Sequence, residues 1–199
     1  MFAKPDISRI YNTRNLQFIV SFLSKYEIPY MIFYGTLLGL MRENNIIEND
    51  DDIDILIEKE YFSRIVDLFG EKNINIAMKE DNIFIQLKYK YNEIITSIDL
   101  YFYERDEERK IIIDKWNFNG HPEQQSWHLY IPMEYIYPLK ITSFVGCNVL
   151  IPNNPMEVIK FLYGERFMQK LKKGSDYVTK IKNNRPYIIY SNEFALRKY

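Results

Sequence analysis

Residues 34–57, Y-G-T-L-L-G-L-M-R-E-N-N-I-I-E-N-D-D-D-I-D-I-L-I, decide how this chain is interpreted. The segment carries four carboxylates within five positions: Asp50, Asp51, Asp52 and Asp54. Isoleucines alternate with the last two acids, and such alternation is typical of a β-strand. On a strand, Asp52 and Asp54 point the same way, with stems roughly 6.5–7 Å apart. Their mutual repulsion is relieved when they share a divalent cation. The segment therefore predicts a metal-dependent centre for phosphoryl or nucleotidyl transfer.

The whole chain has the composition of a soluble globular protein. Its 199 residues are 47% hydrophobic and 27% charged, with a formal net charge of −1, so no nucleic-acid partner is expected. The first ten residues lack the apolar core of a signal peptide. No uninterrupted apolar stretch approaches the ~20 residues of a membrane span. We therefore expect a cytoplasmic protein without a membrane span, and the sequence carries no signal for an oligomeric state.

Hydrophobic spacing around the acidic segment predicts an alternation of helices and strands. The predicted helices are 13–26, 37–42, 60–69 and 155–163. The predicted strands are 30–34, 51–57, 74–78, 83–91, 94–103 and 110–114, with one or two more in 139–151. Residues 115–137 show no regular pattern. This order predicts a single α+β domain with a mixed β-sheet flanked by helices, a core over about 13–168 and a basic C-terminal tail over 169–199.

A turn of small residues, Gly35-Thr36, falls between a predicted strand and a predicted helix. Backbone N–H groups at a helix start are free to hold a phosphate, and glycine permits close approach. An ordinary helix cap explains this pair equally well. Arg42, one helix away, is a candidate contact for the phosphate of a donor. We therefore expect Gly35, Thr36 and Arg42 to shape a substrate site.

A third acid, Asp99, lies in the otherwise apolar strand S-I-D-L at 97–100. Carboxylate oxygens are the ligands that Mg²⁺ and Mn²⁺ prefer. We expect Asp52 and Asp54 to bind such an ion, with Asp99 as a further ligand or as the base that accepts a hydroxyl proton. Each feature alone has a structural explanation: a D-x-D pair is often a solvated face, and a lone strand Asp often an edge residue. Their combination and order favour the functional interpretation.

The same residues resemble a known family. G-T-L-L-G-L-M-R-E-N-N-I-I-E-N-D-D-D-I-D-I is similar to the signature of the LicD/fukutin family, a branch of the nucleotidyltransferase-fold superfamily. Later segments also resemble family landmarks in the same order: S-I-D-L at 97–100, Y-P-L-K at 137–140, I-P-N-N-P at 151–155 and L-Y-G at 162–164. The resemblance spans residues 13–168.

This resemblance implies a fold, an activity and a set of site residues. It implies a nucleotidyltransferase-like fold and an enzyme that moves a phospho-substituent, such as phosphocholine or an alditol phosphate, from a CDP-activated donor to a sugar or glycan hydroxyl. It also implies that Asp52, Asp54 and Asp99 are the catalytic and metal-binding carboxylates. Asp50 would be a further ligand or a substrate-site acid beside Gly35, Thr36 and Arg42. One departure concerns substrate choice: the family's Pro-Trp before the acids is replaced here by Glu48-Asn49.

Two other functions fit the same residues. A nucleotidyltransferase that places NMP on a small molecule or protein would use the same metal centre. A catalytically inactive binding module is disfavoured because the costly carboxylate cluster is intact. A zinc site at His121, His128 and Glu123 is also disfavoured, since their spacing fits no common zinc pattern. The single cysteine, Cys147, excludes an intramolecular disulfide.

Overall fold

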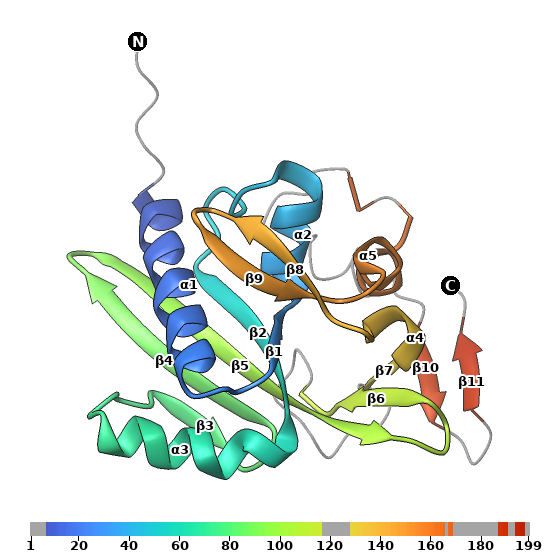
Figure 1. Ribbon diagram of the computed structural model, residues 1–199. Coiled ribbons are helices and arrows are strands. Elements are labelled where there is room, and N and C mark those ends of the chain that lie inside the picture. Colours follow the sequence, from blue (N-terminus) through green and yellow to red (C-terminus); the bar gives the residue numbers. More distant parts are fainter. Residues whose placement is uncertain (1–6, 117–127, 166, 169–186, 191–193, 198–199) are drawn as a thin grey trace.

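The computed structural model describes residues 7–116, 128–165, 167–168, 187–190 and 194–197 (Figure 1). Its helices are α1 (Ile7–Lys25), α2 (Tyr34–Glu43), α3 (Phe62–Glu71), α4 (Met133–Ile136) and α5 (Pro155–Tyr163), with a 3-10 turn, η1 (Lys59–Tyr61). The first six strands are β1 (Tyr30–Ile32), β2 (Asp52–Glu58), β3 (Met78–Glu80), β4 (Phe84–Tyr91), β5 (Ile94–Asp106) and β6 (Ile111–Asp114). The others are β7 (Leu129–Pro132), β8 (Lys140–Phe144), β9 (Cys147–Ile151), β10 (Tyr187–Tyr190) and β11 (Phe194–Arg197).

A seven-stranded sheet forms the centre of the fold. Its main path runs β1-β2-β5-β4-β3, and β6 extends it by pairing with both β5 and β7. The central pair, β2 and β5, is parallel, whereas the other pairings are antiparallel. The α+β class and the mixed sheet predicted from the sequence are therefore confirmed.

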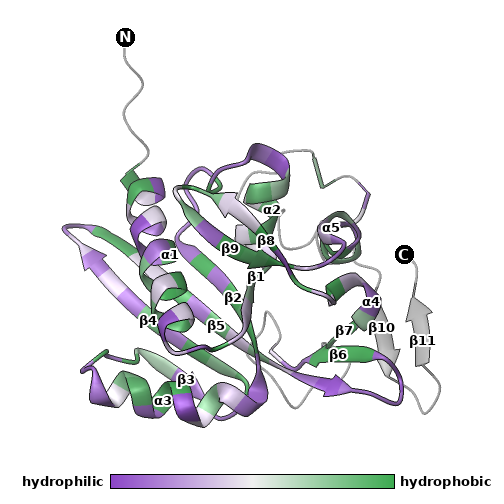
Figure 2. Ribbon diagram, viewed as in Figure 1, coloured by the Kyte–Doolittle hydropathy of each residue, from purple (hydrophilic) through white to green (hydrophobic). Residues whose placement is uncertain are grey.

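Alternation along β2 gives the sheet one apolar face. Ile53, Ile55 and Ile57 are almost completely buried, and Figure 2 shows bands of both colours along this strand. Helices α1 and α3 cover that face, where Phe62 of α3 meets Phe102 of β5 with ring centroids 4.9 Å apart. Burial of this apolar surface is the main stabilising contribution to the fold.

The other face of the same two strands carries the acids. Asp52 and Asp54 alternate with the isoleucines, so they point away from α1 and α3. Helix α2 packs on this side, and Tyr34 at its start meets Tyr101 of β5 with ring centroids 4.9 Å apart. The site therefore lies between α2 and the carboxylate face of the parallel strand pair.

Several predicted boundaries were wrong. Helix α1 begins six residues before the predicted start at 13, and α2 begins at Tyr34 rather than 37, so that Gly35-Thr36 lies inside its first turn. The predicted strand 74–78 is absent, because the N–H of Ile74 closes the end of α3 by donating to Phe69 O (2.8 Å); the strand there is β3, residues 78–80. The irregular segment 115–137 contains β7 and α4 in its described part.

Substituting Gly39 with alanine tests the close packing of α2 against the segment that follows it. A Cβ at this position would lie 2.5 Å from the backbone oxygen of Asn45 and 3.2 Å from Ile47 Cγ1. Overpacking of this kind costs about 1–3 kcal/mol, which outweighs the ~1 kcal/mol that alanine gains in a helix. We expect Gly39→Ala to lower the free energy of unfolding in urea. An unchanged or raised value would contradict this close contact.

Candidate active site

Strand register brings the predicted carboxylates of β2 and β5 together. Asp54 of β2 pairs with Asp99 of β5, and Asp52 pairs with Ser97 two residues earlier on each strand. On the far side of β5, the antiparallel strand β4 places Gln86 opposite Asp99. Paired residues share a face of the sheet. The structure therefore brings Asp52, Asp54 and Asp99 to one face, as the alternation in the sequence predicted for the first two.

Asp54 is buried, with 5% of its surface exposed. One carboxylate oxygen accepts a hydrogen bond from the Thr36 N–H (3.3 Å), and the other accepts one from the Tyr101 hydroxyl (3.1 Å). Burial raises the pKa of Asp54 well above its usual range, and the nearby charges of Asp52, Asp50 and Asp99 raise it further. The fold therefore places a carboxylate where its negative charge is poorly compensated by the protein itself.

Asp99 lies beside Asp54 in a similar environment. It is 7% exposed, and Gln86 Nε2 donates to its two oxygens at 3.0 and 3.3 Å. Burial raises the pKa of Asp99 to about 6, although the Gln86 hydrogen bond opposes the shift. A carboxyl group with this pKa is well suited to accept a proton near neutral pH.

The acids just before β2 and at its first residue form a separate, more open group. Asp50, Asp51 and Asp52 each place one carboxylate oxygen within 4.8 Å of the others, an arrangement that could hold a metal ion. Asp54 and Asp99 lie outside this group of three. Gly35 lies between this group and Asp54, because a Cβ added to it would be 3.1 Å from Asp54 Oδ2 and 3.2 Å from Asp50 Oδ2. The absence of a side chain at Gly35 therefore leaves space between two carboxylates.

Thr36 fastens the start of α2 to the acidic strand. Its hydroxyl oxygen accepts a hydrogen bond from the Asp54 N–H (2.8 Å), while its own N–H donates to the Asp54 carboxylate. The side chain is buried, with 3% of the residue exposed. In this structure the Thr36 hydroxyl is therefore used in a hydrogen bond with the backbone of Asp54. The phosphate contact predicted for Gly35 and Thr36 stays a prediction.

The first residue of α2 has a strained backbone. Tyr34 has a φ of 39°, a left-handed conformation that costs a bulky residue on the order of 1–3 kcal/mol. Its hydroxyl donates to Asp114 Oδ2 at 2.5 Å, and Asp114 is completely buried. Strain of this kind persists only where the surroundings hold it, and it clusters at functional sites.

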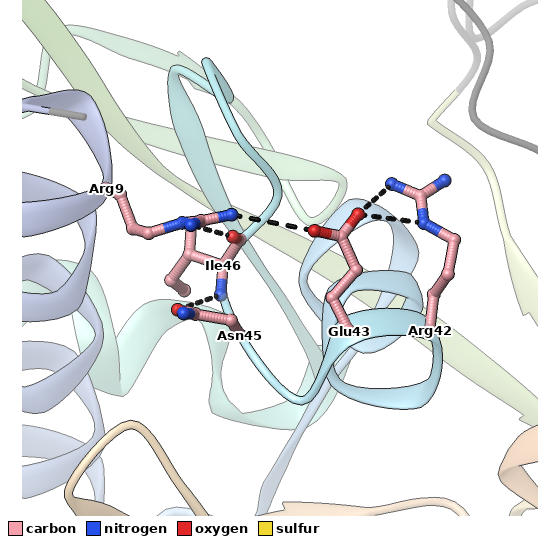
Figure 3. Close-up of polar contacts among 5 residues, drawn as sticks. All are labelled: Arg9, Arg42, Glu43, Asn45 and Ile46. Carbon is pink, nitrogen blue, oxygen red and sulfur yellow. Dashed lines mark hydrogen bonds and ion pairs between the residues drawn. The ribbon is translucent and has the colours of Figure 1, made fainter. Parts of the chain in front are cut away.

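Arg42 lies at the other end of α2 and is engaged by its neighbour (Figure 3). Its Nε and Nη2 donate to Glu43 Oε1 at 3.0 and 2.8 Å. The second oxygen of Glu43 lies 3.6 Å from Arg9 Nη2 of α1, and Arg9 Nε donates to Ile46 O (2.8 Å). Glu43 therefore joins α1 to α2, a role that the sequence did not suggest. The predicted contact of Arg42 with a donor phosphate stays a prediction.

Comparison with known proteins places this geometry in a family. Residues 27–154 match the model described as LicD/FKTN/FKRP, nucleotidyltransferase domain. The chain belongs to the LicD/FKTN/FKRP family. The matched region contains α2, the whole acidic segment and Asp99, so the family resemblance read from the sequence is confirmed.

Two relatives carry transferase names. The chain is 25% identical over 166 residues to ribitol-5-phosphate transferase FKTN of Homo sapiens, a match that covers 79% of this chain and 33% of the relative. It is 30% identical over 69 residues to lipopolysaccharide cholinephosphotransferase LicD of Haemophilus influenzae, covering 33% of this chain and 26% of the relative. The chain thus spans at most about a third of the length of either relative.

A solved structure agrees on the fold. Lincosamide antibiotic adenylyltransferase LnuA, with lincomycin bound, matches with a TM-score of 0.52 at 12% identity, over 85% of this chain and 93% of that one. The nucleotidyltransferase-like fold predicted for this LicD-family chain is therefore confirmed. Among the described residues, no helix is both long enough and apolar enough to cross a membrane.

Two buried asparagines on α1 donate hydrogen bonds to the segment before β2 and to β5 in this LicD-family chain. Asn12 Nδ2 donates to Asp50 O (2.9 Å), and Asn15 Nδ2 donates to the Thr96 hydroxyl of β5 (2.9 Å). Both asparagines are almost completely buried. The pair therefore ties the backbone before β2 to the strand that carries Asp99.

Replacing Asn12 with leucine keeps the size of the side chain and removes its donor. Since Asp50 O then loses its hydrogen bond from Asn12 Nδ2, and the Asn15 amide loses its bond to Asn12 Oδ1 (3.4 Å), the free energy of unfolding should fall by about 1–3 kcal/mol. Urea denaturation measures this. The matched control is Asn153→Leu, whose amide makes an exposed bond to Glu134 O (3.4 Å). Equal effects of the two substitutions would contradict the anchoring role of Asn12.

The remaining sequence predictions have mixed outcomes. His128 is buried near Tyr130, with the Tyr130 hydroxyl 3.5 Å from its Nδ1, whereas His121 and Glu123 lie outside the described residues. Most of the basic tail also lies outside them.

Three residues at the site were not predicted from the sequence: Tyr101, Gln86 and Asn12. Tyr101 lies two residues after Asp99 and could have been found from strand alternation, but Gln86 and Asn12 depend on tertiary pairings.

Proposed function

We propose that this chain is a metal-dependent transferase that moves a phospho-substituent from a CDP-activated donor to a sugar or glycan hydroxyl. The observation that carries the proposal is the pairing of Asp54 with Asp99 on the parallel strands β2 and β5. Two buried carboxylates side by side, with Asp52 and Asp50 next to them, destabilise a fold unless a cation compensates their charge. Family membership supports transfer of a phosphorus-containing group as the use of that charge.

The carboxylates present fit a hard divalent cation. Asp52, Asp54 and Asp99 would hold Mg²⁺ or Mn²⁺ through oxygen, and Asp50 would serve as a further ligand or line the substrate site. The fit rests on the pairing of Asp54 with Asp99, and it agrees with the pKa of Asp54, which burial raises and the neighbouring carboxylates raise further. When bound, such a cation supplies charge neutralisation at phosphate oxygens and lowers the barrier to transfer.

The reaction exchanges one P–O bond for another. The acceptor hydroxyl oxygen attacks the phosphorus that carries the transferred group, the bond from that phosphorus to the bridging oxygen breaks, and CMP leaves. The hydroxyl proton must go to a base. Asp99 has the required pKa, about 6, and this role is an alternative to its role as a ligand. Gly35, Thr36 and Arg42 would lie around the donor phosphates at the two ends of α2.

The names of the relatives suggest the classes of donor and acceptor. One relative is a ribitol-5-phosphate transferase and another a lipopolysaccharide cholinephosphotransferase, so we propose an alditol phosphate or phosphocholine as the transferred group. Glu48 and Asn49, both exposed just before Asp50, replace the family's Pro-Trp. The added charge and the missing aromatic surface favour a substrate that differs from the usual one at this position.

Position-specific labels in the donor test the proposal. CDP-ribitol and CDP-choline, labelled either in the cytidine or in the transferred group, are incubated with Mn²⁺ and a panel of glycans, and CTP and ATP with labelled bases run in parallel. We expect label from the transferred group on the glycan and cytidine label in CMP. Nucleoside label on the acceptor would instead show a nucleotidyltransferase. No transfer from any donor, together with no Mn²⁺ binding, would identify a binding module.

A further inference from the structure

A pocket lies at the opposite end of β2 and β5 from the acidic site. It has a volume of about 330 Å³ and is lined by the start of β1, the end of β2, the end of β5 and the segment after α4. Asp54 and Glu58 are four residues apart on β2, a separation of ~13 Å. Leu56 and Tyr101, both buried, fill the sheet face between them. The pocket is therefore separate from the transfer centre.

Tyrosine rings and paired charges line this pocket. The hydroxyls of Tyr103 and Tyr137 are hydrogen-bonded to each other, and the Arg105 guanidinium lies 4.4 Å from the centroid of the Tyr137 ring. Arg105 Nε also lies 3.2 Å from Glu58 Oε1 and donates to the Tyr137 hydroxyl at 3.1 Å. The Glu58 carboxylate is therefore held beside a guanidinium that tyrosine side chains fix in place.

The charges of the pocket disfavour a charged ligand of either sign. An anion would have to compete with Glu58 for Arg105 while facing the second carboxylate, Glu60. A cation would approach Glu58 only by displacing or facing the Arg105 guanidinium, and the other carboxylate that it would meet, Glu60, is exposed to solvent, where its attraction is weakened. A neutral molecule rich in hydroxyl groups needs neither, since carboxylates accept its hydrogen bonds and the guanidinium donates to it.

We infer that this pocket binds a neutral saccharide. Its volume lies at the lower end of the range for small-molecule sites, ~300–1,000 Å³, so one sugar ring is the expected occupant. The apolar C–H face of a sugar ring packs on tyrosine rings, while its hydroxyls hydrogen-bond to Glu58, Glu60 and Arg105. The inference goes beyond the proposed transfer, because binding here needs neither Asp52, Asp54 and Asp99 nor a metal ion.

Saturation-transfer NMR on the full chain in EDTA tests the inference. The probes are glucose, galactose and mannose, with glucosamine and glucose 6-phosphate as cationic and anionic versions of one ring. We expect at least one neutral sugar to bind at millimolar concentration and to bind more tightly than either charged probe. Absence of binding by all three neutral sugars, or tighter binding of a charged probe, would overturn the inference.

Variants locate the binding. Glu60→Gln leaves the Arg105–Glu58 pair intact and should weaken sugar binding about five- to ten-fold, because a neutral amide oxygen replaces a charged acceptor in one hydrogen bond. The matched control is Glu93→Gln, the same change at an exposed turn, and circular dichroism confirms that each variant is folded. Asp54→Asn should bind the sugar as the wild type does. If Asp54→Asn abolishes binding, or Glu60→Gln leaves it unchanged, the sugar does not bind in this pocket.

Discussion

Replacing Asp54 with asparagine should reduce transfer by about 10²–10³-fold or more, a loss typical of removing one group that stabilises transition-state charge. The asparagine side chain keeps the local contacts, since its oxygen can accept from the Thr36 N–H and its amide can donate to the Tyr101 hydroxyl. The change therefore removes charge with little change of shape. Release of CMP from the donor measures the loss.

The same substitution should stabilise the metal-free protein. The folded pKa of Asp54 is raised above its ordinary value of 3.8, so the folded state disfavours the ionised form. The resulting destabilisation is absent at pH values below the ordinary pKa and grows as the pH rises toward the folded pKa. Asparagine removes this penalty, and we expect a higher free energy of unfolding in EDTA at pH 7.

A substitution that lowers the rate of transfer but raises the free energy of unfolding identifies a functional carboxylate, whereas loss of a structural carboxylate lowers the free energy of unfolding. Asp67→Asn, on the exposed side of α3, is the matched control and should change neither quantity appreciably. If Asp54→Asn lowers the stability of the metal-free protein, Asp54 supports the fold. If it also retains full transfer, the proposed centre is wrong.

Gly35→Ala should reduce transfer by about 10–100-fold without unfolding the chain. The added methyl group would lie 3.1 Å from Asp54 Oδ2 and 3.2 Å from Asp50 Oδ2, so both carboxylates must shift by a few tenths of an ångström. Small displacements of positioned groups cost up to about 10²-fold in rate. The methyl group also fills the space that a phosphate would approach. Steady-state kinetics with the CDP-linked donor measure this effect.

Gly70→Ala is the matched control for this substitution. Gly70 also lies in a helix, α3, but a Cβ there would meet nothing within 4 Å. Alanine at that position should leave transfer unchanged and stabilise the chain by about 0.5–1 kcal/mol. Equal activity of the two variants would show that the space beside Gly35 has no part in transfer.

The acidic strand could be predicted from sequence because its signal is local. Alternation of Asp52 and Asp54 with isoleucines is enough to predict the strand, its buried face and the shared direction of the two acidic side chains. Asp99 was expected as a third carboxylate of the site, but its pairing with Asp54 was not predicted, because no local pattern shows which strands are neighbours. The parallel β2–β5 register supplies that information.

Other parts of the site depend on contacts between distant segments. Asn12 reaches Asp50 across 38 positions, a contact that no local pattern in the sequence indicates. Gln86 meets Asp99 only through the β4–β5 pairing. The start of α2 was misplaced because Gly35-Thr36 resembles a turn, whereas the bonds between Thr36 and Asp54 hold these residues in the helix.

Anomalous diffraction from crystals soaked with Mn²⁺ and CDP tests the central claim most directly. The claim is that Asp52, Asp54 and Asp99 together bind the cation that holds the donor phosphates. We predict a manganese peak in contact with these three carboxylates and with a phosphate oxygen of CDP. Ordered CDP without manganese, or manganese held by Asp50, Asp51 and Asp52 alone, would contradict it.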